Sequence, residues 1–137
     1  MSIKENKALI RRMYELLSMR KLDAFFECFS PECITHNSTL GNSSMDQVKE
    51  RITGFFTSFP DCTFTVEDLV AEGDRVVLRE TMRGTQKGVV MDIPPTGNKI
   101  EVADIAIYKI TDGKVAEIWE TTDFLRMLQQ LGVIPKK

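Results

Sequence analysis

Asp123 is the acidic residue whose position points most directly to chemistry. It follows Lys114–Thr122, a stretch with the composition of a β-strand, and it shares one face of that strand with Trp119. A carboxyl group beside an apolar wall is harder to ionise, which raises its pKa toward neutrality. Such a group both accepts and returns protons at neutral pH. Asp123 is therefore a candidate general acid/base.

A second interpretation of Asp123 is structural. The residues from Phe124 to Leu131 have helical spacing, with Gly132 at the end of the pattern and Pro135 beyond it. Asp is one of the preferred residues immediately before the first turn of a helix, where its side chain accepts a backbone N–H. The spacing alone favours this helix cap over the catalytic role.

Two further side chains share the strand face of Asp123. Successive strand residues point to opposite sides, so Glu117 and Trp119 lie on this face while Ile118 and Glu120 lie on the other. We expect the first face to line a pocket, with Glu117 and Trp119 contacting the ligand. A plain core position explains the Trp119 side chain equally well.

His36 is the only histidine of the chain, and Asn37, which follows it, is a candidate substrate-binding residue. It ends the stretch 33–36, which is either a short extended piece or a loop. In one interpretation His36 polarises a substrate carbonyl or shares a proton with Asp123, and in the other it is a surface or hydrogen-bonded structural residue. Too few ligands accompany His36 for a metal site, and we expect neither a metal nor an organic cofactor.

Arg79 is a charged residue in the middle of the predicted strand Arg75–Arg83. A buried cation at such a position needs an acidic partner. The neighbouring Glu80 points to the opposite face and does not serve as one. Arg79 therefore reaches either the pocket or a surface at which two copies of the chain pair.

The elements that position these residues change character after Pro60. Apolar residues first recur at helical spacing, and from Thr63 onward they alternate as in strands. Helices followed by an antiparallel meander predict an α+β domain, with the helices on one face of the sheet and a cavity between them if the sheet bends. The predicted helices span residues 3–17, 22–29, 45–59 and 124–131, and the predicted strands span 63–71, 75–83, 100–110 and 114–122.

Composition limits the class of protein and of partner. The 137 residues fit one domain, 1–137, and the 18 basic and 20 acidic residues are interspersed, which argues against nucleic-acid and membrane partners. Three cysteines without CxxC spacing argue against disulfides and structural zinc. The N-terminus lacks a signal-like apolar stretch, so we expect a cytoplasmic protein.

Several motifs occur together in an order that resembles the SnoaL-like polyketide cyclase and ester cyclase family of the nuclear transport factor two-like superfamily. The resemblance implies a cone-shaped α+β barrel with three N-terminal helices on a strongly curved, mainly antiparallel sheet and a short C-terminal helix. It also implies a pocket for a hydrophobic small molecule, homodimers that pair through the sheets, and the role of Asp123 in an aldol ring closure. The motifs are Thr35–Asn37, Phe59–Asp61, Glu72–Val76, Gly84–Thr85, Ile93–Gly97, Asp112–Lys114, Glu117–Trp119, Asp123 and Leu128–Val133.

The chain departs from the family pattern at two positions. Many relatives have a histidine where this chain has Gln86, which donates a hydrogen bond to an oxyanion but exchanges no proton at neutral pH. Many also carry an Asp where this chain has Ala106. Asp104 lies two residues earlier on the same strand face and is a candidate to replace it in space.

The resulting prediction is a cyclase- or isomerase-type enzyme that acts on a hydrophobic carbonyl compound without a cofactor. Asp123 would remove a proton alpha to the carbonyl, and His36 and Gln86 would stabilise the enolate. Two alternatives stay open. The chain is a binding domain that holds an apolar ligand without turnover, or it is a structural dimerisation module of the same fold.

Overall fold

The helices begin where the sequence provides caps. The computed structural model of the chain describes residues 2–135, in which α1 spans Ile3–Ser18, α2 Leu22–Phe26, α3 Met45–Ser58 and α4 Phe124–Gln130. Ser2 with Glu5, and Ser44 with Gln47, form capping boxes at the starts of α1 and α3, because each side chain bonds the backbone N–H of the other residue. The second helix is shorter than predicted and ends three residues before Phe29.

The strands form one mixed sheet in the order β2-β1-β6-β5-β4-β3. Neighbouring strands are antiparallel except β1 and β6, which run parallel. The sequence of Cys33–His36 allowed either a short extended piece or a loop. In the structure these residues lie within β1. The strands are β1 Phe29–Asn37, β2 Gly41–Ser43, β3 Thr63–Glu72, β4 Arg75–Thr85, β5 Lys99–Thr111 and β6 Lys114–Thr122.

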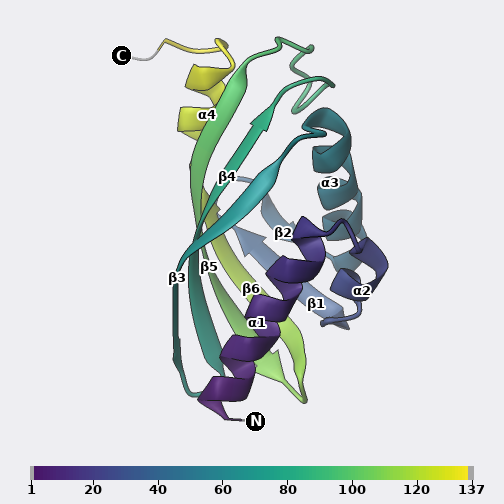
Figure 1. Ribbon diagram of the computed structural model, residues 1–137, viewed down its shortest axis with the longest axis vertical. Coiled ribbons are helices and arrows are strands. Elements are labelled where there is room, and N and C mark those ends of the chain that lie inside the picture. Colours follow the sequence, from purple (N-terminus) through teal and green to yellow (C-terminus); the bar gives the residue numbers. More distant parts are fainter. Residues whose placement is uncertain (1, 136–137) are drawn as a thin grey trace.

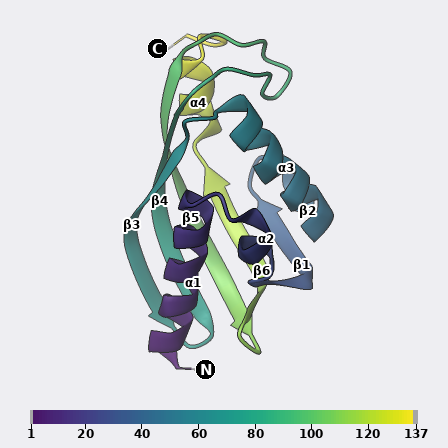
Figure 2. The same cartoon turned by 45° about the vertical axis from the view of Figure 1, so that its right-hand side comes forward.

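The sheet curls around one layer of helices. Figures 1 and 2 show α1, α2 and α3 on the same side of the curved strands, with α4 at the end of the molecule near the C-terminus. This arrangement confirms the predicted α+β architecture with helices on one face of a strongly curved, mainly antiparallel sheet. No helix within residues 2–135 is long and apolar enough to cross a membrane.

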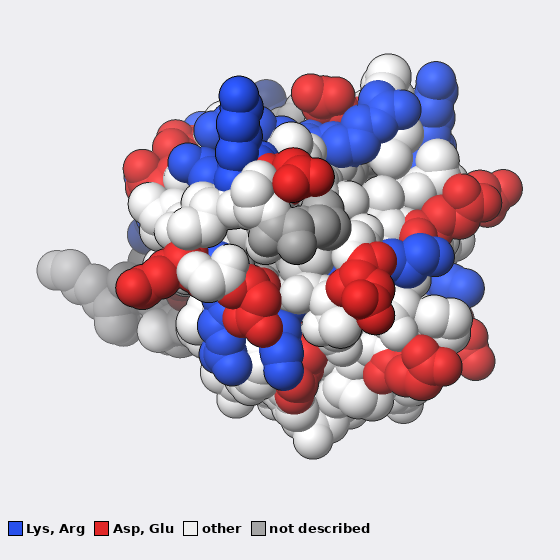
Figure 3. All heavy atoms as spheres, turned by 90° about the horizontal axis from the view of Figure 1, so that it is seen from below, with Lys and Arg blue, Asp and Glu red and all other residues white. Residues whose placement is uncertain are grey.

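The inner face of the sheet follows a strict alternation. In β5, Ile100, Val102, Asp104, Ala106 and Tyr108 are buried, while the residues that alternate with them are more exposed. This alternation directs one side of each strand into the core, as the two-residue period requires. On the end of the molecule shown in Figure 3, acidic and basic side chains are interspersed.

Candidate active site

A cavity of about 440 Å³ lies between the inner face of the sheet and the helices. Its volume falls in the range that small-molecule sites occupy. Leu40, Arg51, Val89 and Met91 are exposed members of its wall, so the cavity opens to solvent on their side. Most of the remaining wall is apolar and includes Leu17, Phe25, Phe29, Val48, Met82 and Phe124.

Two buried carboxyl groups face each other in this cavity wall. Glu80 of β4 and Asp104 of β5 are directly opposed cross-strand partners, with exposures of 4% and 5%. Burial raises the pKa of Glu80 to about 8, and the nearby charge of Asp104 adds to this. Burial likewise raises the pKa of Asp104 to about 7, although the Thr122 hydroxyl acts in the opposite direction. Two carboxylates buried opposite each other repel strongly, so the pair holds one proton near neutral pH.

The carboxyl pair belongs to a longer buried hydrogen-bond chain. The Tyr14 hydroxyl donates to Glu80 Oε2 at 2.5 Å, and it lies 2.8 Å from the Tyr108 hydroxyl. Tyr14 has one proton to give, so Tyr108 donates to Tyr14. At the other end, the Thr122 hydroxyl donates to Asp104 Oδ1 at 2.6 Å. Each carboxyl group of the pair therefore accepts one hydroxyl donor, Glu80 from Tyr14 and Asp104 from Thr122.

Glu120 supplies a third carboxyl group on the same inner face. Asn37 Nδ2 donates to Glu120 Oε1 at 3.2 Å. The other amide atom of Asn37, Oδ1, accepts the backbone N–H groups of Thr39 and Leu40 and so orients the amide. Burial raises the pKa of Glu120, while the charge of Arg51 opposes this shift.

Asn37 and Asp104 are the two predicted site residues that line the cavity. Asp123 is exposed, and its Oδ1 accepts the backbone N–H of Arg126 at 3.0 Å as the N-cap of α4. The observed contact is the helix cap that the spacing favoured. The catalytic role of Asp123 stays a prediction, and Asp123 is not among the residues that line the cavity.

Three other predicted residues gather on the outer face of the sheet. His36 Nε2 lies 2.6 Å from Glu117 Oε2, and this hydrogen bond raises the pKa of His36. The His36 ring stacks on Trp119, and Arg75 covers the indole ring with its guanidinium carbon 4.8 Å from the centroid. The cavity face of β6 is the alternate one, with Ile118, Glu120 and Thr122. Contact of Glu117 and Trp119 with a ligand stays a prediction, because they lie on the face of β6 opposite the one that lines the cavity.

Gln86 and Arg79 also have partners outside the cavity. Gln86 is fully buried and uses its amide to hold residues 86–96 together. Its Nε2 donates to the carbonyl groups of Gly88, Ile93 and Pro94, and its Oε1 accepts the N–H and hydroxyl of Thr96. Arg79 projects from the outer face and pairs with Asp68 at 2.6 Å.

Sequence reasoning missed most polar residues of the cavity, among them Tyr14, Glu80, Tyr108, Glu120 and Thr122. A signal was present in the strand alternation. Glu80 occupies the same face of β4 as the buried Val76 and Leu78, and Asp104 occupies the face of Val102 and Ala106. A carboxyl group in an otherwise apolar alternating series is a functional candidate, since burial of a charge is costly.

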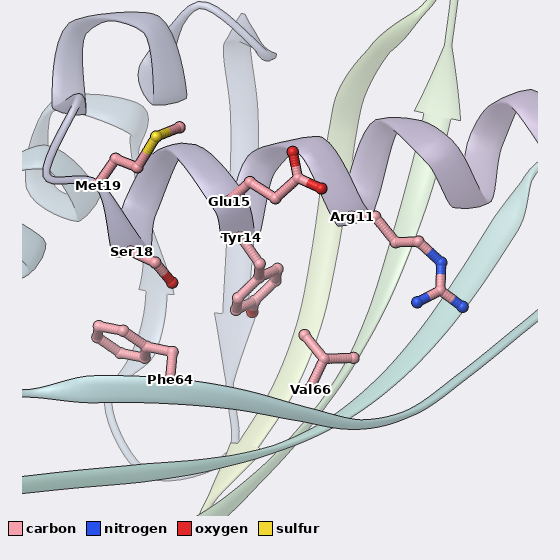
Figure 4. Close-up of a pocket in the computed structure, with 7 residues that line it drawn as sticks. All are labelled: Arg11, Tyr14, Glu15, Ser18, Met19, Phe64 and Val66. Atoms are coloured by element: carbon pink, nitrogen blue, oxygen red, sulfur yellow. The ribbon is translucent and has the colours of Figure 1, made fainter.

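A second hollow lies outside this cavity, between α1 and β3 (Figure 4). Arg11 and Glu15 of α1 and Met19, the residue that follows this helix, border it. It shares the side chains of Tyr14 and Phe64 with the first cavity. Arg11 and Glu15 are exposed to solvent. The first cavity is therefore the stronger candidate, because of these two hollows it is the one whose apolar wall contains buried carboxyl groups. Within residues 2–135, no group of three or more His, Cys, Asp or Glu residues has an arrangement that could hold a metal ion.

Comparison with known proteins agrees with this architecture. Residues 7–131 match the sequence model of a family described as SnoaL-like polyketide cyclase. The structure of AclR from Streptomyces galilaeus, provisionally described as a hydroxylase, is 29% identical with a TM-score of 0.90, and the match covers 98% of this chain and 100% of AclR. TsrD from Streptomyces laurentii is 27% identical with a TM-score of 0.86, and the coverage is 98% and 99%.

IdmH from Streptomyces antibioticus is also similar in structure. It is provisionally described as a polyketide cyclase and is 28% identical, with a TM-score of 0.81 over 93% of this chain and 99% of IdmH. No curated protein matches the sequence at a significant level. The family match and these structures agree over nearly the whole chain.

Proposed function

Since the chain belongs to the SnoaL-like polyketide cyclase family, we propose that it is a cyclase-type enzyme that enolises a hydrophobic carbonyl compound inside the cavity. The observation that carries this proposal is the buried Glu80–Asp104 pair in the cavity wall. In this proposal Asp104 takes the acid/base role that the sequence suggested for Asp123. The change rests on position, because Asp104 lines the cavity and Asp123 caps α4 at the surface.

The first step is removal of a proton from the carbon next to a carbonyl group. In this proposal Asp104, which accepts the Thr122 hydroxyl, is the ionised member of the pair and Glu80 is the protonated member. The raised pKa of Asp104 makes it a stronger base than an exposed Asp. The C–H electron pair moves into the enolate while the proton passes to Asp104. The charge of the cavity is unchanged by this transfer, since the enolate gains the charge that Asp104 loses.

The second step uses the same proton again. The enolate carbon attacks another carbonyl carbon of the ligand, forming the new ring bond and an alkoxide. Asp104, now a carboxylic acid, returns its proton to the alkoxide oxygen. Base and acid are then restored without an external proton. The wall around the carboxyl groups is largely apolar and offers few groups that would hold water beside the enolate.

Exchange of solvent deuterium into 2-tetralone, a hydrophobic ketone with acidic alpha protons, tests the enolisation step by NMR. The wild-type protein is expected to accelerate the exchange over buffer. Asp104→Asn should slow it about 10²- to 10⁴-fold, which is the usual contribution of a positioned acid or base. Glu101→Gln, which removes an exposed carboxylate from the outer face of the same strand, is the matched control. Exchange in Asp104→Asn at the wild-type rate would contradict the proposal.

We also propose that two copies of the chain pair through the outer face of the sheet, in the cytoplasm where the three free cysteines stay reduced. Ile105 is 49% exposed on this face. Burial of such apolar surface favours association. Light scattering of the purified protein is expected to give the mass of a dimer, and Ile105→Glu should give a monomer. A wild-type monomer at all concentrations would refute the pairing.

A further inference from the structure

We propose that the ligand of this cavity carries a basic nitrogen and that Glu120 binds this nitrogen as an ammonium group. The inference names a ligand class for the same cavity. It rests on the proposed function only in taking the cavity as the ligand site, and it does not depend on which residue transfers protons.

The first support is the free acceptor capacity of Glu120. A carboxylate offers about four lone-pair positions on its two oxygens. Asn37 Nδ2 uses one of them at Oε1. Within residues 2–135, no side chain or backbone group bonds Oε2, and Oε2 is not among the buried atoms that lack a partner. The oxygen therefore opens into the cavity, where a ligand donor can reach it.

The second support is the charge balance of the wall. Glu80, Asp104 and Glu120 are all acidic, and among residues 2–135 the only Lys or Arg that lines this cavity is Arg51. Arg51 is exposed, its Nη2 donates to Ser43 Oγ at 2.6 Å, and it forms no ion pair with the three acidic residues. Solvent screens an exposed cation far more than a buried one. The cavity therefore keeps a net negative charge beside a largely apolar wall.

These two features select among ligand groups. A hydroxyl group satisfies the free oxygen of Glu120 but leaves its charge uncompensated. A ligand carboxylate adds a like charge to a space of low dielectric constant, where repulsion is strong. An ammonium group both donates the hydrogen bond and neutralises the charge, and such charge-assisted bonds are the stronger ones.

The strand register places Asp104, the proposed base, and Glu120, the proposed ammonium site, close enough for one ligand to contact both. Across β5 and β6, Asp104 is opposite Thr122 and Ala106 is opposite Glu120. Asp104 and Glu120 are thus diagonal neighbours on the inner face, a relationship that spans roughly 7–8 Å. A ligand that holds its nitrogen at Glu120 can present a carbon atom of an attached ring to Asp104.

Calorimetric binding of three matched probes at neutral pH tests the inference. The probes are 1-naphthylmethylamine, 1-naphthylmethanol and 1-naphthoate, which share one ring system and differ in charge. Wild-type protein is expected to bind the amine about tenfold more tightly than the alcohol, with the carboxylate weakest. Glu120→Gln keeps an acceptor for Asn37 but removes the charge, so the amine and the alcohol should then bind almost equally.

Two further variants sharpen the result. Arg51→Gln removes the competing cation and should increase the amine preference. Glu101→Gln removes an outer-face charge and should leave it unchanged. Equal wild-type affinities for amine and alcohol, a preference that persists in Glu120→Gln, or failure of all three probes to bind would overturn the inference. The assay involves no turnover, so deuterium exchange without amine preference would refute the ligand class and leave the enzyme proposal intact.

Discussion

Glu80 and Asp104 face each other directly across β4 and β5 with both carboxyl groups buried at the inner face of the sheet. Two such groups do not both ionise without strong repulsion, since little solvent is present to screen them. The Tyr14 and Thr122 hydroxyl groups orient the pair from its two ends. The pair therefore couples the protonation of the folded protein to its stability as well as to its chemistry.

The first prediction is that stability falls as pH rises toward the alkaline side. The pKa values of Glu80 and Asp104 rise from 4.5 and 3.8 to about 8 and about 7. Between the ordinary pKa values and these raised ones, the folded state therefore binds more protons than the unfolded state. Their contribution is fully present below about pH 4 and is lost as pH rises through about 7 to 8. The loss reaches about 1.4 kcal/mol per pH unit for each proton.

Urea unfolding at a series of pH values measures this dependence. The double variant Glu80→Gln with Asp104→Asn keeps the size of both side chains and removes both protonation sites. It should show a flatter dependence of the unfolding free energy on pH than the wild type. Glu120 contributes in the same direction, because burial raises its pKa as well, so some slope should remain. Identical slopes in the two proteins would show that the pair ionises normally.

The second prediction concerns Tyr14. Its hydrogen bond lowers the pKa of Glu80, so Tyr14→Phe should raise that pKa further. Glu80 then stays protonated to higher pH, and the alkaline limit of the exchange reaction should move upward. The Tyr108 hydroxyl loses its acceptor, at a cost of about 1–3 kcal/mol in unfolding free energy.

Tyr108→Phe is the matched comparison for this variant. It removes the Tyr108 hydroxyl, which bonds only Tyr14 in this series of hydrogen bonds, but leaves the bond from Tyr14 to Glu80 intact. Its pH–rate profile should therefore stay closer to the wild type. If both variants kept the wild-type profile, the tyrosines would have no influence on the carboxyl pair.

The helix starts and the α+β class follow from short-range features of the sequence. Ser2 and Ser44 predict helix starts because a capping box depends on residues three positions apart. Asp112 and Gly113 form the hairpin turn between β5 and β6, and both have positive φ, as the turn requires.

The candidate site depends on relationships that no local pattern contains. Alternation shows that Trp119 and Glu120 face opposite sides, but it does not say which side is inner. Tyr14 and Glu80 are 66 positions apart in the chain, and only the packing of α1 on the sheet brings them together. Asp123 is a different case, because its residue type and position fit both a helix cap and an acid/base residue. The sequence does not distinguish these roles, and the observed contact is the helix cap.

The third prediction concerns Gln86. Gln86→Ala leaves several polar groups of residues 86–96 without partners. The unfolding free energy should fall by about 2 kcal/mol or more, since each buried unpaired group is costly. Val89, Val90 and Met91 of this segment line the cavity, so KM should rise more than kcat falls. A large loss of kcat at unchanged stability would instead support the oxyanion role predicted from the sequence.

The fourth prediction separates the two roles of Asp123. Asn is as good an N-cap as Asp, whereas Ala accepts no backbone hydrogen bond. Asp123→Asn should therefore keep the unfolding free energy, and Asp123→Ala should lower it by about 0.5–2 kcal/mol. An amide exchanges no proton, so the deuterium-exchange rate of Asp123→Asn reports on catalysis without the effect of a lost cap. With Asp104 as the base, that rate should stay near the wild-type rate. A rate as low as that of Asp104→Asn, at full stability, would return the acid/base role to Asp123.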